Sequence, residues 1–445
     1  MLLSLALCAP LQDAAPSDWT RFRGEEGSAV LPADAHPGSW SLEDNLAWSV
    51  AVPGIGWSSP LVIGDAVYVT SAIEPHRERP MDFSAGVADP STFGTGVEAP
   101  EEPVRYQVRA YALADGELRW EKELLEQVAA HGVHPSNTYA TESPATDGEH
   151  LYVLFAMPGL VASLDASGEE RWRAELGSYP TEADFGTSSS LVVDDGRVYV
   201  QHDNEESSFV LALDASSGEE VWRAERAGGT SWASPMLIEA GGRKQFVALG
   251  DGEVTSYAPE DGSVLWSLSG IQGNFSASAT WDGERLYAGN SGPMIRGVLL
   301  ALDLGASGTH PLVREEGEAE PEGQTPLLWS HERMGPGFAT PVVHDGLLYV
   351  LGGSMGILAC HDAATGERLW RNRLPEGAAV VSSPWVVGDE LFLLDETGKT
   401  FVVAVGPEFE LLRTNTIEDL FWSTPSFAQG NLLLRGVDRM YCIRR

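Results

Sequence analysis

The 445-residue chain is poor in cysteine, in basic residues and in long apolar runs. Its three cysteines, Cys8, Cys360 and Cys442, are too few for a disulfide framework, and nothing in their spacing suggests a metal site. We expect Cys360 and Cys442 to be buried structural thiols. Only 28 Lys and Arg stand against 65 Asp and Glu, which gives a formal net charge of −37. This balance argues against a nucleic-acid partner and predicts a solvated acidic surface.

No run after the first residues is long and apolar enough to cross a bilayer. The first ten residues, Met1 to Pro10, are similar to a secretory signal whose basic front is missing. We therefore expect residues 1–15 to be a signal-like segment and the protein to be exported, to the periplasm or the cell surface. Leu5-Ala6-Leu7-Cys8 resembles a lipoprotein cleavage box, although Leu7 is bulky where a small residue is expected. A lipid anchor on Cys8 is thus an alternative to ordinary cleavage.

Three common catalytic signatures are also absent from the sequence. It contains no Gly-x-Ser-x-Gly elbow, no phosphate-binding P-loop and no His-Glu-x-x-His zinc motif. The glycine-rich stretch 352–356 lies between two expected strands and predicts a hairpin.

The chain has instead a repeated turn that ends in Trp. In the clearest copy, Ala212 to Trp222, a strand ends, Asp214 can bond the backbone of its own turn, Gly218 can take a positive φ, and a new strand begins. A fixed-period repeat is typical of arrays and propellers. The Trp residues at this phase of the repeat are Trp48, Trp120, Trp172, Trp222, Trp266, Trp329 and Trp370.

A second signature, Ser or Thr usually followed by Pro, opens each repeat, and the chain has eight such openings. Each opening leaves room for four short strands of period-two alternation before the Trp. We therefore predict an all-β, eight-bladed propeller of four-stranded antiparallel blades, with no substantial helix. The propeller should fill residues 46–445 as one domain, after a lead-in at 16–45. Insertions at 73–104, 121–140 and 305–326 are predicted to be surface loops.

The closure of the ring is also predicted from the sequence. The eighth opening, Ser423-Thr424-Pro425, is followed by only three strands before the chain ends. The missing outer strand should be the early segment Leu46 to Val50, which would remove an open sheet edge.

The turn Asp-x-x-[Ser/Thr]-Gly-[Glu/Lys]-x-x-Trp resembles the tryptophan-docking motif of the pyrroloquinoline-quinone (PQQ) repeat propellers, over about residues 40–445. The stretch Asp18-Trp19-Thr20-Arg21-Phe22-Arg23-Gly24 is similar to the opening motif of secreted PQQ-like proteins of planctomycete-type bacteria. The resemblance implies an eight-bladed fold in which the Trp side chains pack between neighbouring blades. It says little about activity.

This superfamily holds two functional kinds, PQQ- and calcium-dependent dehydrogenases of alcohols or sugars, and scaffolds without cofactor such as the outer-membrane-assembly lipoprotein. The chain lacks the adjacent cysteine pair that stacks on PQQ in many of the dehydrogenases, and it is shorter than they are. We therefore expect a non-catalytic monomer that binds a protein or glycan and needs no cofactor. The dehydrogenase, with PQQ and calcium, is the alternative, and a propeller binding another small ligand or metal is a third hypothesis.

Two polar stretches are the candidates for a ligand or channel site. The first is His202, Asp203, Asn204, Glu205 and Glu206, of which the last four offer oxygens of the kind that calcium prefers. On a strand Glu205 and Glu206 would point to opposite faces, so both reach one ion only if the stretch is a loop. The competing interpretation is a polar loop that satisfies its own backbone.

The second stretch precedes the second blade and contains His134, Asn137, Tyr139 and Glu142. These residues are candidates for the mouth of the central channel, although a single histidine does not make a metal site. Trp232, beside a blade opening, is a candidate for stacking a planar ligand. For these residues the competing interpretations are a hydrogen-bonded structural histidine and packing of the indole near the propeller axis.

Overall fold

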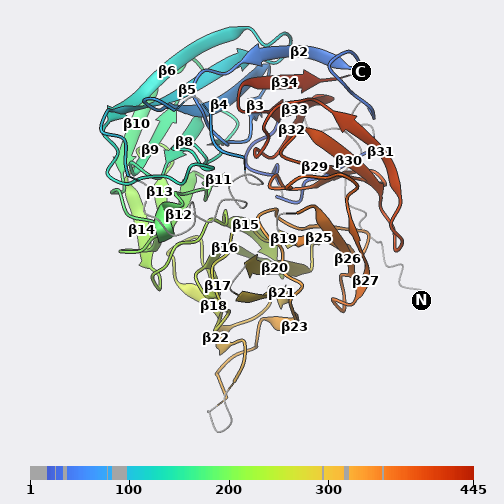
Figure 1. Ribbon diagram of the computed structural model, residues 1–445. Helices are drawn as coiled ribbons and strands as arrows, with labels where there is room; N and C mark the ends of the chain where they lie inside the picture. The colour runs from blue at the N-terminus through green and yellow to red at the C-terminus, as the bar shows by residue number, and fades with distance from the viewer. Residues whose placement is uncertain are drawn as a thin grey trace, which may run out of the picture.

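The computed structural model describes residues 18–25, 27–33, 38–77, 79–82, 98–292, 295–314, 320–352 and 355–444. Eight sheets are arranged in a ring, and each is built on four antiparallel strands (Figure 1). The one described helical turn is the 3-10 turn η2, Glu182–Asp184. The predicted all-β, eight-bladed propeller is therefore confirmed. The signal-like segment 1–15, with Cys8, lies outside the described residues. Within the described part no helix has the length and apolar character to traverse a bilayer.

The first four blades follow one another along the chain, each running from its inner to its outer strand. Blade 1 contains β3 (Leu61–Ile63), β4 (Ala66–Ile73), β5 (Val104–Ala112) and β6 (Leu118–Gln127). Blade 2 contains β7 (Ala145–Thr146), β8 (Leu151–Phe155), β9 (Leu160–Leu164) and β10 (Glu170–Glu175). Blade 3 contains β11 (Val192–Asp194), β12 (Arg197–His202), β13 (Phe209–Asp214) and β14 (Glu220–Glu225). Blade 4 contains β15 (Met236–Ala240), β16 (Arg243–Gly250), β17 (Glu253–Tyr257) and β18 (Val264–Ser269).

The other four blades complete the ring. Blade 5 contains β19 (Thr280–Trp281), β20 (Arg285–Gly292), β21 (Ile295–Asp303) and β23 (Leu327–Glu332). Blade 6 contains β24 (Val342–His344), β25 (Leu347–Gly352), β26 (Ile357–Asp362) and β27 (Arg368–Arg373). Blade 7 contains β28 (Trp385–Val387), β29 (Glu390–Leu394), β30 (Lys399–Ala404) and β31 (Leu411–Thr416). Blade 8 contains β32 (Ser426–Ala428), β33 (Asn431–Arg435) and β34 (Arg439–Ile443), with β2 (Leu46–Ala51) as its outer strand.

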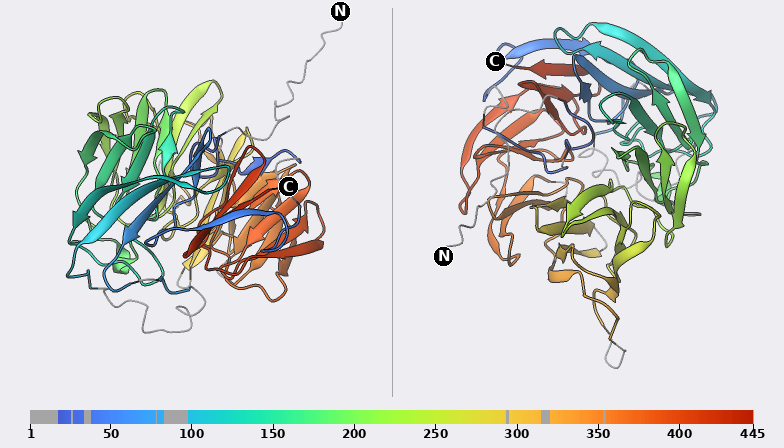
Figure 2. Two further views of the ribbon diagram at one scale, coloured as in Figure 1. Left: turned by 90° about the horizontal axis from the view of Figure 1, so that it is seen from above. Right: turned by 180° about the vertical axis from the view of Figure 1, so that it is seen from behind.

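The predicted closure by an N-terminal strand is confirmed. β2 pairs antiparallel with β34, with Ser49 opposite Tyr441, and β2 lies beside β34 in Figures 1 and 2. The first and last parts of the chain thus share one blade, so the ring is held by main-chain hydrogen bonds.

The repeated turn contacts the Trp of the preceding blade. Asp214 Oδ1 accepts hydrogen bonds from the backbone of Ser216 and Ser217, and Gly218 has a φ of +75°. A Cβ on Gly218 would lie 2.4 Å from the Trp172 ring, so the glycine admits the indole. Six indole N–H groups donate to a carbonyl of the next blade, in the pairs Trp48–Leu113, Trp120–Ala166, Trp172–Ala215, Trp222–Pro259, Trp329–Ala363 and Trp370–Gly406.

Blade 4 departs from this pattern because its outer edge is occupied. β22 (Gly308–Pro311) pairs in parallel with β18, and Trp266, opposite Gly308, is fully buried and donates to Gln245 of its own blade. The predicted surface loop at 305–326 is therefore wrong for this strand. The loop predicted at 121–140 is likewise wrong for residues 121–127, which continue β6.

The Ser and Thr residues that open the blades form a ring of hydrogen bonds around the axis. In seven successive pairs, the backbone N–H of one opening residue donates to the hydroxyl of the next blade's opening residue, at 2.8–3.2 Å. The ring runs through Ser59, Ser143, Ser190, Ser234, Ser278, Thr340, Ser383 and Thr424. Seven of these eight hydroxyls thus satisfy a buried amide where the inner strands converge. The series is open between Thr424 and Ser59, whose buried hydroxyl has no hydrogen-bond partner among the described residues.

The residues 18–25 and 27–31, called here the axial segment, lie against the inner strands. Trp19 exchanges two backbone hydrogen bonds with Val62 of β3, and β1 (Val30–Leu31) pairs in parallel with β28 of blade 7. Arg23 is buried, and its guanidinium donates to carbonyls of its own segment, Gly27 and Ser28, and of the openings of blades 6 and 7, Pro341 and Pro384. No carboxylate is among these partners, and burial lowers the pKa of Arg23 to about 9.

Candidate functional site

The two candidate stretches lie on the same face of the propeller. In an antiparallel meander, the hairpins between second and third strands lie on the same face as the blade-to-blade connections. Residues 203–208 join β12 to β13, and residues 128–144 join blade 1 to blade 2. We call this the connection face. The opposite face, with the hairpins between first and second strands, is the turn face.

The segment 180–187, which contains η2, brings the two stretches into one hydrogen-bond network. On one side, the backbone N–H of His134 donates to Asp184 and the amide of Asn137 donates to Phe185 and Thr187. On the other side, the backbone N–H of Glu205 donates to Pro180. The sequence analysis offered both stretches as candidates for a ligand or channel site, but it did not identify the segment that joins them.

Asp203 is committed to a buried ion pair. Its carboxylate lies 2.9 Å from Arg226, and each side chain is 1% exposed. Gln201 also donates to Asp203, and Arg226 donates to the Tyr257 hydroxyl. Burial raises the pKa of Asp203, and the Arg226 charge opposes that rise. Because both charges are desolvated, removal of either one would leave the other uncompensated.

The neighbours of Asp203 stabilise their own loop. Asn204 accepts from the backbone of Glu206 and Ser207 and donates to His202 and Ser207. Glu205 accepts from the backbone and the hydroxyl of Thr230, at 2.9 and 2.6 Å, while Glu206 is exposed. His202 contacts the carbonyl of Ala156, and burial lowers its pKa to about 4, so its ring is neutral at pH 7.

The stretch before blade 2 is equally occupied. Asn137 accepts from Thr138 and Thr141, the Tyr139 hydroxyl donates to the carbonyl of His131, and His134 Nδ1 lies 2.7 Å from the Ser136 hydroxyl. Glu142 is 1% exposed and accepts a hydrogen bond from Thr187. Desolvation raises its pKa to about 7, against several hydrogen bonds that lower it.

Trp232 packs within the same network. Its indole N–H donates to the carbonyl of Gly186 at 2.7 Å, and its ring meets Phe185 edge-on at 6.0 Å. Phe185 in turn lies 4.8 Å from the His134 ring. The indole therefore ties blade 4 to the segment between blades 2 and 3.

These residues do not fit the calcium ion of the dehydrogenase alternative. The side-chain oxygens of Asp203, Asn204 and Glu205 are directed to three different partners. A calcium site needs several oxygens around one point, and this one would have to break the Asp203–Arg226 pair to obtain them. The stretch is a loop, as the calcium hypothesis requires, but its hydrogen bonds serve the backbone.

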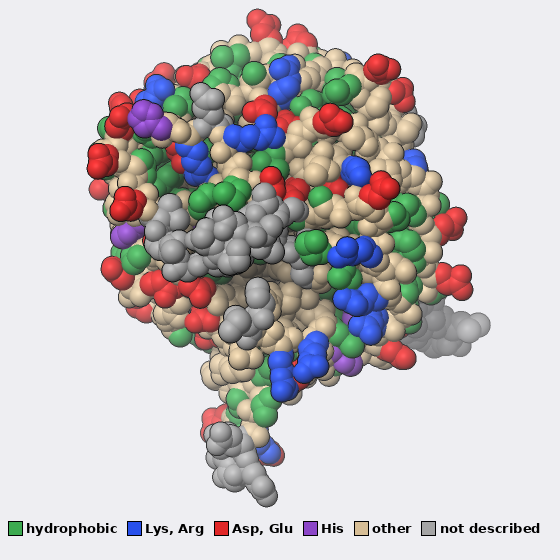
Figure 3. All heavy atoms as spheres, in the orientation of Figure 1, with side chains coloured by type: hydrophobic (Ala, Val, Ile, Leu, Met, Phe, Trp, Pro, Cys, Tyr) green, Lys and Arg blue, Asp and Glu red, His purple; other side chains and the backbone are tan. Residues whose placement is uncertain are grey.

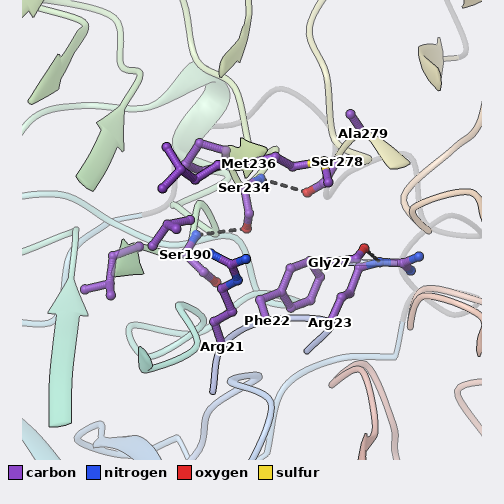
Figure 4. Close-up of a pocket in the computed structure, with 13 residues that line it drawn as sticks. Arg21, Phe22, Arg23, Gly27, Ser190, Ser234, Met236, Ser278 and Ala279 are labelled. Atoms are coloured by element: carbon purple, nitrogen blue, oxygen red, sulfur yellow. Dashed lines mark hydrogen bonds between the residues drawn. The ribbon is translucent and has the colours of Figure 1, made fainter. Parts of the chain in front are cut away.

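The axis offers little room on the turn face. Figure 4 shows Arg21 and Phe22 of the axial segment beside the opening serines of blades 3 to 5, while the Arg23 side chain points away from them. The cavity between them measures about 30 Å³, which suits water-sized molecules and is far below the volume of a cofactor pocket.

Two further features escaped the sequence analysis. A cavity of about 610 Å³ opens on the connection face between blades 6, 7 and 8, and its charged lining residues include Arg79, Glu418, Asp419 and Asp438. Arg79 lies 2.7 Å from Asp438, and Tyr441 donates to Asp419, whose pKa is raised by burial. Among the described residues, His344, Asp345 and Asp389 also form a group whose ligand atoms lie within 4.8 Å of one another. Each set joins loops far apart in the sequence, so no local motif marks it.

Comparison with known families matches residues 105–309 and 318–405, more than half of the chain, to the model described as outer membrane protein assembly factor BamB. The BamB of Burkholderia pseudomallei is 27% identical over 281 residues, which are 60% of this chain and 64% of that protein. The tetrathionate hydrolase of Acidithiobacillus ferrooxidans is 23% identical over 207 residues, 46% of this chain and 33% of that enzyme. The match thus spans less than two thirds of either relative.

Among solved structures, BamB from Moraxella catarrhalis superimposes with a TM-score of 0.55 at 13% identity, covering 89% of this chain and 98% of that one. A europium-containing methanol dehydrogenase gives a TM-score of 0.50 at 13% identity, covering 88% and 90%. At such identities the likeness shows the fold alone.

Proposed function

The chain belongs to the BamB family of PQQ-like propellers, and from that premise we propose that it is a non-catalytic, extracytoplasmic scaffold that binds a protein or glycan partner. Two further points of the proposal are that it acts as a monomer and that it resides in the periplasm or at the cell surface, with a lipid anchor on Cys8 as the alternative mode of attachment. The curated BamB relative and its family description, an outer membrane protein assembly factor, support the extracytoplasmic part.

One observation carries the proposal. The polar side chains that the sequence offered as candidate site residues make hydrogen bonds and an ion pair that hold the loops of the connection face together. The Asp203 carboxylate pairs with Arg226, the Glu205 carboxylate holds Thr230, and the amide of Asn137 ties two connections. A general base must reach a substrate proton, and a metal must reach several free oxygens. Neither is offered by this network, whereas a rigid propeller with large exposed loops suits a binding scaffold.

The alternative, a PQQ- and calcium-dependent dehydrogenase or a binder of another small ligand, is favoured by the cavity between blades 6, 7 and 8. Its volume of about 610 Å³ falls in the range of small-molecule sites. Its carboxylates, which include Glu418 and Asp438, are of the type that calcium prefers. Arg79 and Arg439 lie in the same lining and offset part of that charge.

The test is reconstitution of the purified mature protein with PQQ and calcium, followed by a dye-linked oxidation assay over a panel of alcohols and sugars. The scaffold proposal predicts no turnover above that of free PQQ. Turnover that needs both additions, and that falls in Asp419→Asn but not in the matched surface variant Asp214→Asn, would establish the dehydrogenase instead.

A further inference from the structure

The outer strand of blade 6 carries a reversed charge pattern. In β10 and β14 the residues around the Trp follow the order Glu-x-Trp-Arg-x-Glu, as Glu170, Arg173 and Glu175 and as Glu220, Arg223 and Glu225. In β27 the same positions read Arg-x-Trp-Arg-x-Arg, as Arg368, Arg371 and Arg373. Both positions that are acidic in blades 2 and 3 are arginine in blade 6, in a chain whose net charge is −37.

The backbone shows that these positions are equivalent. In blades 2, 3 and 6 the register of the outer strand shifts beside the Trp, which lies opposite Ser163, Ala212 and Cys360 respectively. The residue two before the Trp then pairs with the next position of the neighbouring strand in each blade. A side-chain contact seen in blades 2 and 3 is therefore a fair guide to the geometry in blade 6.

In the acidic versions, the arginine that follows the Trp has a partner. Arg223 lies 2.9 Å from Glu220, and Arg173 pairs with Glu170 in the same way. In β27, Arg368 stands where that glutamate would be, so the guanidinium of Arg371 faces a like charge. Within the described residues, the side chains of the three β27 arginines make no hydrogen bond or ion pair, and all three residues are exposed.

These arginines line an open sheet edge. β27 is the last strand in the order β24-β25-β26-β27, so the main-chain groups on its outer side have no strand partner in the sheet. Figure 3 shows Lys and Arg side chains gathered over blades 5 and 6, beside β23 and β27. Arg371 and Arg373 are two residues apart, so they project to the same side of the strand.

Blade 4 shows what an occupied outer edge looks like in this fold. There β22 adds a fifth strand to β18 over four residues, from Gly308 to Pro311. The Trp beneath it, Trp266, is fully buried, whereas Trp370 of blade 6 remains partly exposed. An added strand therefore fits the outer edge of a blade while the four strands inside it remain paired.

We propose that β27 is the docking edge for an extended acidic polypeptide segment of a partner protein, which pairs with the strand through its backbone and places carboxylates against Arg368, Arg371 and Arg373. Main-chain pairing supplies affinity in this mode of recognition, and the alternate side chains supply specificity. A carboxylate between neighbouring guanidiniums accepts charge-assisted hydrogen bonds and removes their mutual repulsion. This inference rests on the proposed scaffold function and names the chemistry of its partner.

The test is the binding of a fluorescent peptide of about ten residues with Glu and Thr alternating, a length typical of a strand. The fluorescence anisotropy of the peptide is measured at about 20 mM and about 200 mM salt. Dissolved salt weakens contacts between exposed charges much more than contacts between buried charges, so the two conditions distinguish them. The wild-type protein should bind the peptide at low salt. The variant R368E/R373E restores the pattern of blade 3 and should bind roughly tenfold more weakly or worse.

The matched control is K122E/R171E, which makes the same change of net charge on the outer strands of blades 1 and 2 and should bind like the wild type. Thermal unfolding checks that each variant is folded, and Arg373→Gln provides a milder change at the same edge. A wild-type protein that does not bind, or an equal loss in both double variants, would overturn the proposal.

Two other probes test the kind of occupant. A peptide of the same sequence with alternate backbone nitrogens methylated keeps its charge but cannot pair along one edge, so it should bind poorly. Equal binding would refute strand pairing. Inorganic polyphosphate should compete weakly, and tighter binding of polyphosphate than of the peptide would make β27 a general anion site. These failures concern β27 alone, whereas turnover with PQQ and calcium would overturn the scaffold function itself.

Discussion

The charged residues of the connection face and those of β27 differ in what they contact. Asp203 and Arg226 are desolvated against each other, and the residues around them satisfy buried backbone groups. Arg368 and Arg371, at positions where blades 2 and 3 hold an ion pair, have no side-chain partner in the described structure. This difference indicates that a polar side chain is a better candidate for a binding surface when its charge and hydrogen-bonding groups have no partner within the protein. Polarity alone is a weaker criterion.

The largest expected effect breaks the buried side of this comparison. Asp203→Ala leaves Arg226 charged and buried, and such a loss is expected to reduce the free energy of unfolding by about 3–5 kcal/mol. Arg371→Ala, at the exposed edge, is expected to change it by less than about 0.5 kcal/mol. Urea unfolding of the two variants measures both values. Equal and small changes would mean that the Asp203 pair is open to water.

A change of similar size is expected for the interface between blades. Trp222→Ala removes an indole that is 8% exposed and is hydrogen-bonded to Pro259 of the next blade. The expected loss is about 3–5 kcal/mol, the usual value for a buried aromatic side chain. Val221→Ala on the same strand, where the side chain is 44% exposed, is the control. If Trp222→Ala costs less than about 1 kcal/mol, the Trp contacts do not hold the blades together.

The pH dependence of stability sharpens the comparison at Glu142. The pKa of this carboxyl rises from 4.5 to about 7 in the folded protein, because burial disfavours its charge. The contribution of Glu142 to the free energy of unfolding is therefore complete below pH 4.5, where the carboxyl is protonated in both states. It is lost as the pH rises through about 7, a change of about 3 kcal/mol.

Glu142→Gln should remove that loss. The difference in free energy of unfolding between the variant and the wild type should therefore grow in favour of the variant between pH 5 and pH 8 and then level off. The comparison with wild type at each pH is needed because His202, with its lowered pKa, gives stability the opposite trend at lower pH. Parallel curves for the two proteins would show that Glu142 is solvated. Denaturant titration across this pH range gives the curves.

The smallest expected effect is at the hydroxyl ring. Ser234 accepts from Ser190 and its own N–H donates to Ser278, so Ser234→Ala removes one acceptor and leaves the Ser190 amide unsatisfied. The expected loss is about 1–3 kcal/mol, as for other buried donors that lose a partner. Amide hydrogen exchange at Ser190 should also become faster. No change in either measurement would imply that water replaces the hydroxyl.

The fold was predictable because its information is local. The turn around Asp214 and Gly218 specifies a hairpin, the alternation of apolar residues specifies strands, and the incomplete eighth blade predicts the position of β2. The fifth strand β22 was not predictable, because it lies in an insertion that has no repeat to compare it with. The hydroxyl ring was predicted only in part. The opening Ser and Thr residues were recognised in the sequence, but their hydrogen-bond partners lie in the next blade and could not be identified from it.

The candidate residues were selected for polarity, and the sequence cannot show how much of that polarity is used internally. Arg226 lies 23 residues after Asp203 and belongs to no motif, so the ion pair could not be foreseen. The charge reversal in β27 was present in the sequence. A comparison of the residues around Trp172, Trp222 and Trp370 would have revealed it.

The measurement that tests the account most directly is thermal unfolding of the mature protein with PQQ, with calcium, with both and with neither. A ligand present at about 100 times its dissociation constant stabilises the folded state by about 2.7 kcal/mol, which is readily detected. The account predicts the same unfolding temperature in all four samples, because Asp203, Asn204 and Glu205 already use their side-chain oxygens within the protein. An increase that requires PQQ and calcium together would contradict it and would make this propeller a quinoprotein.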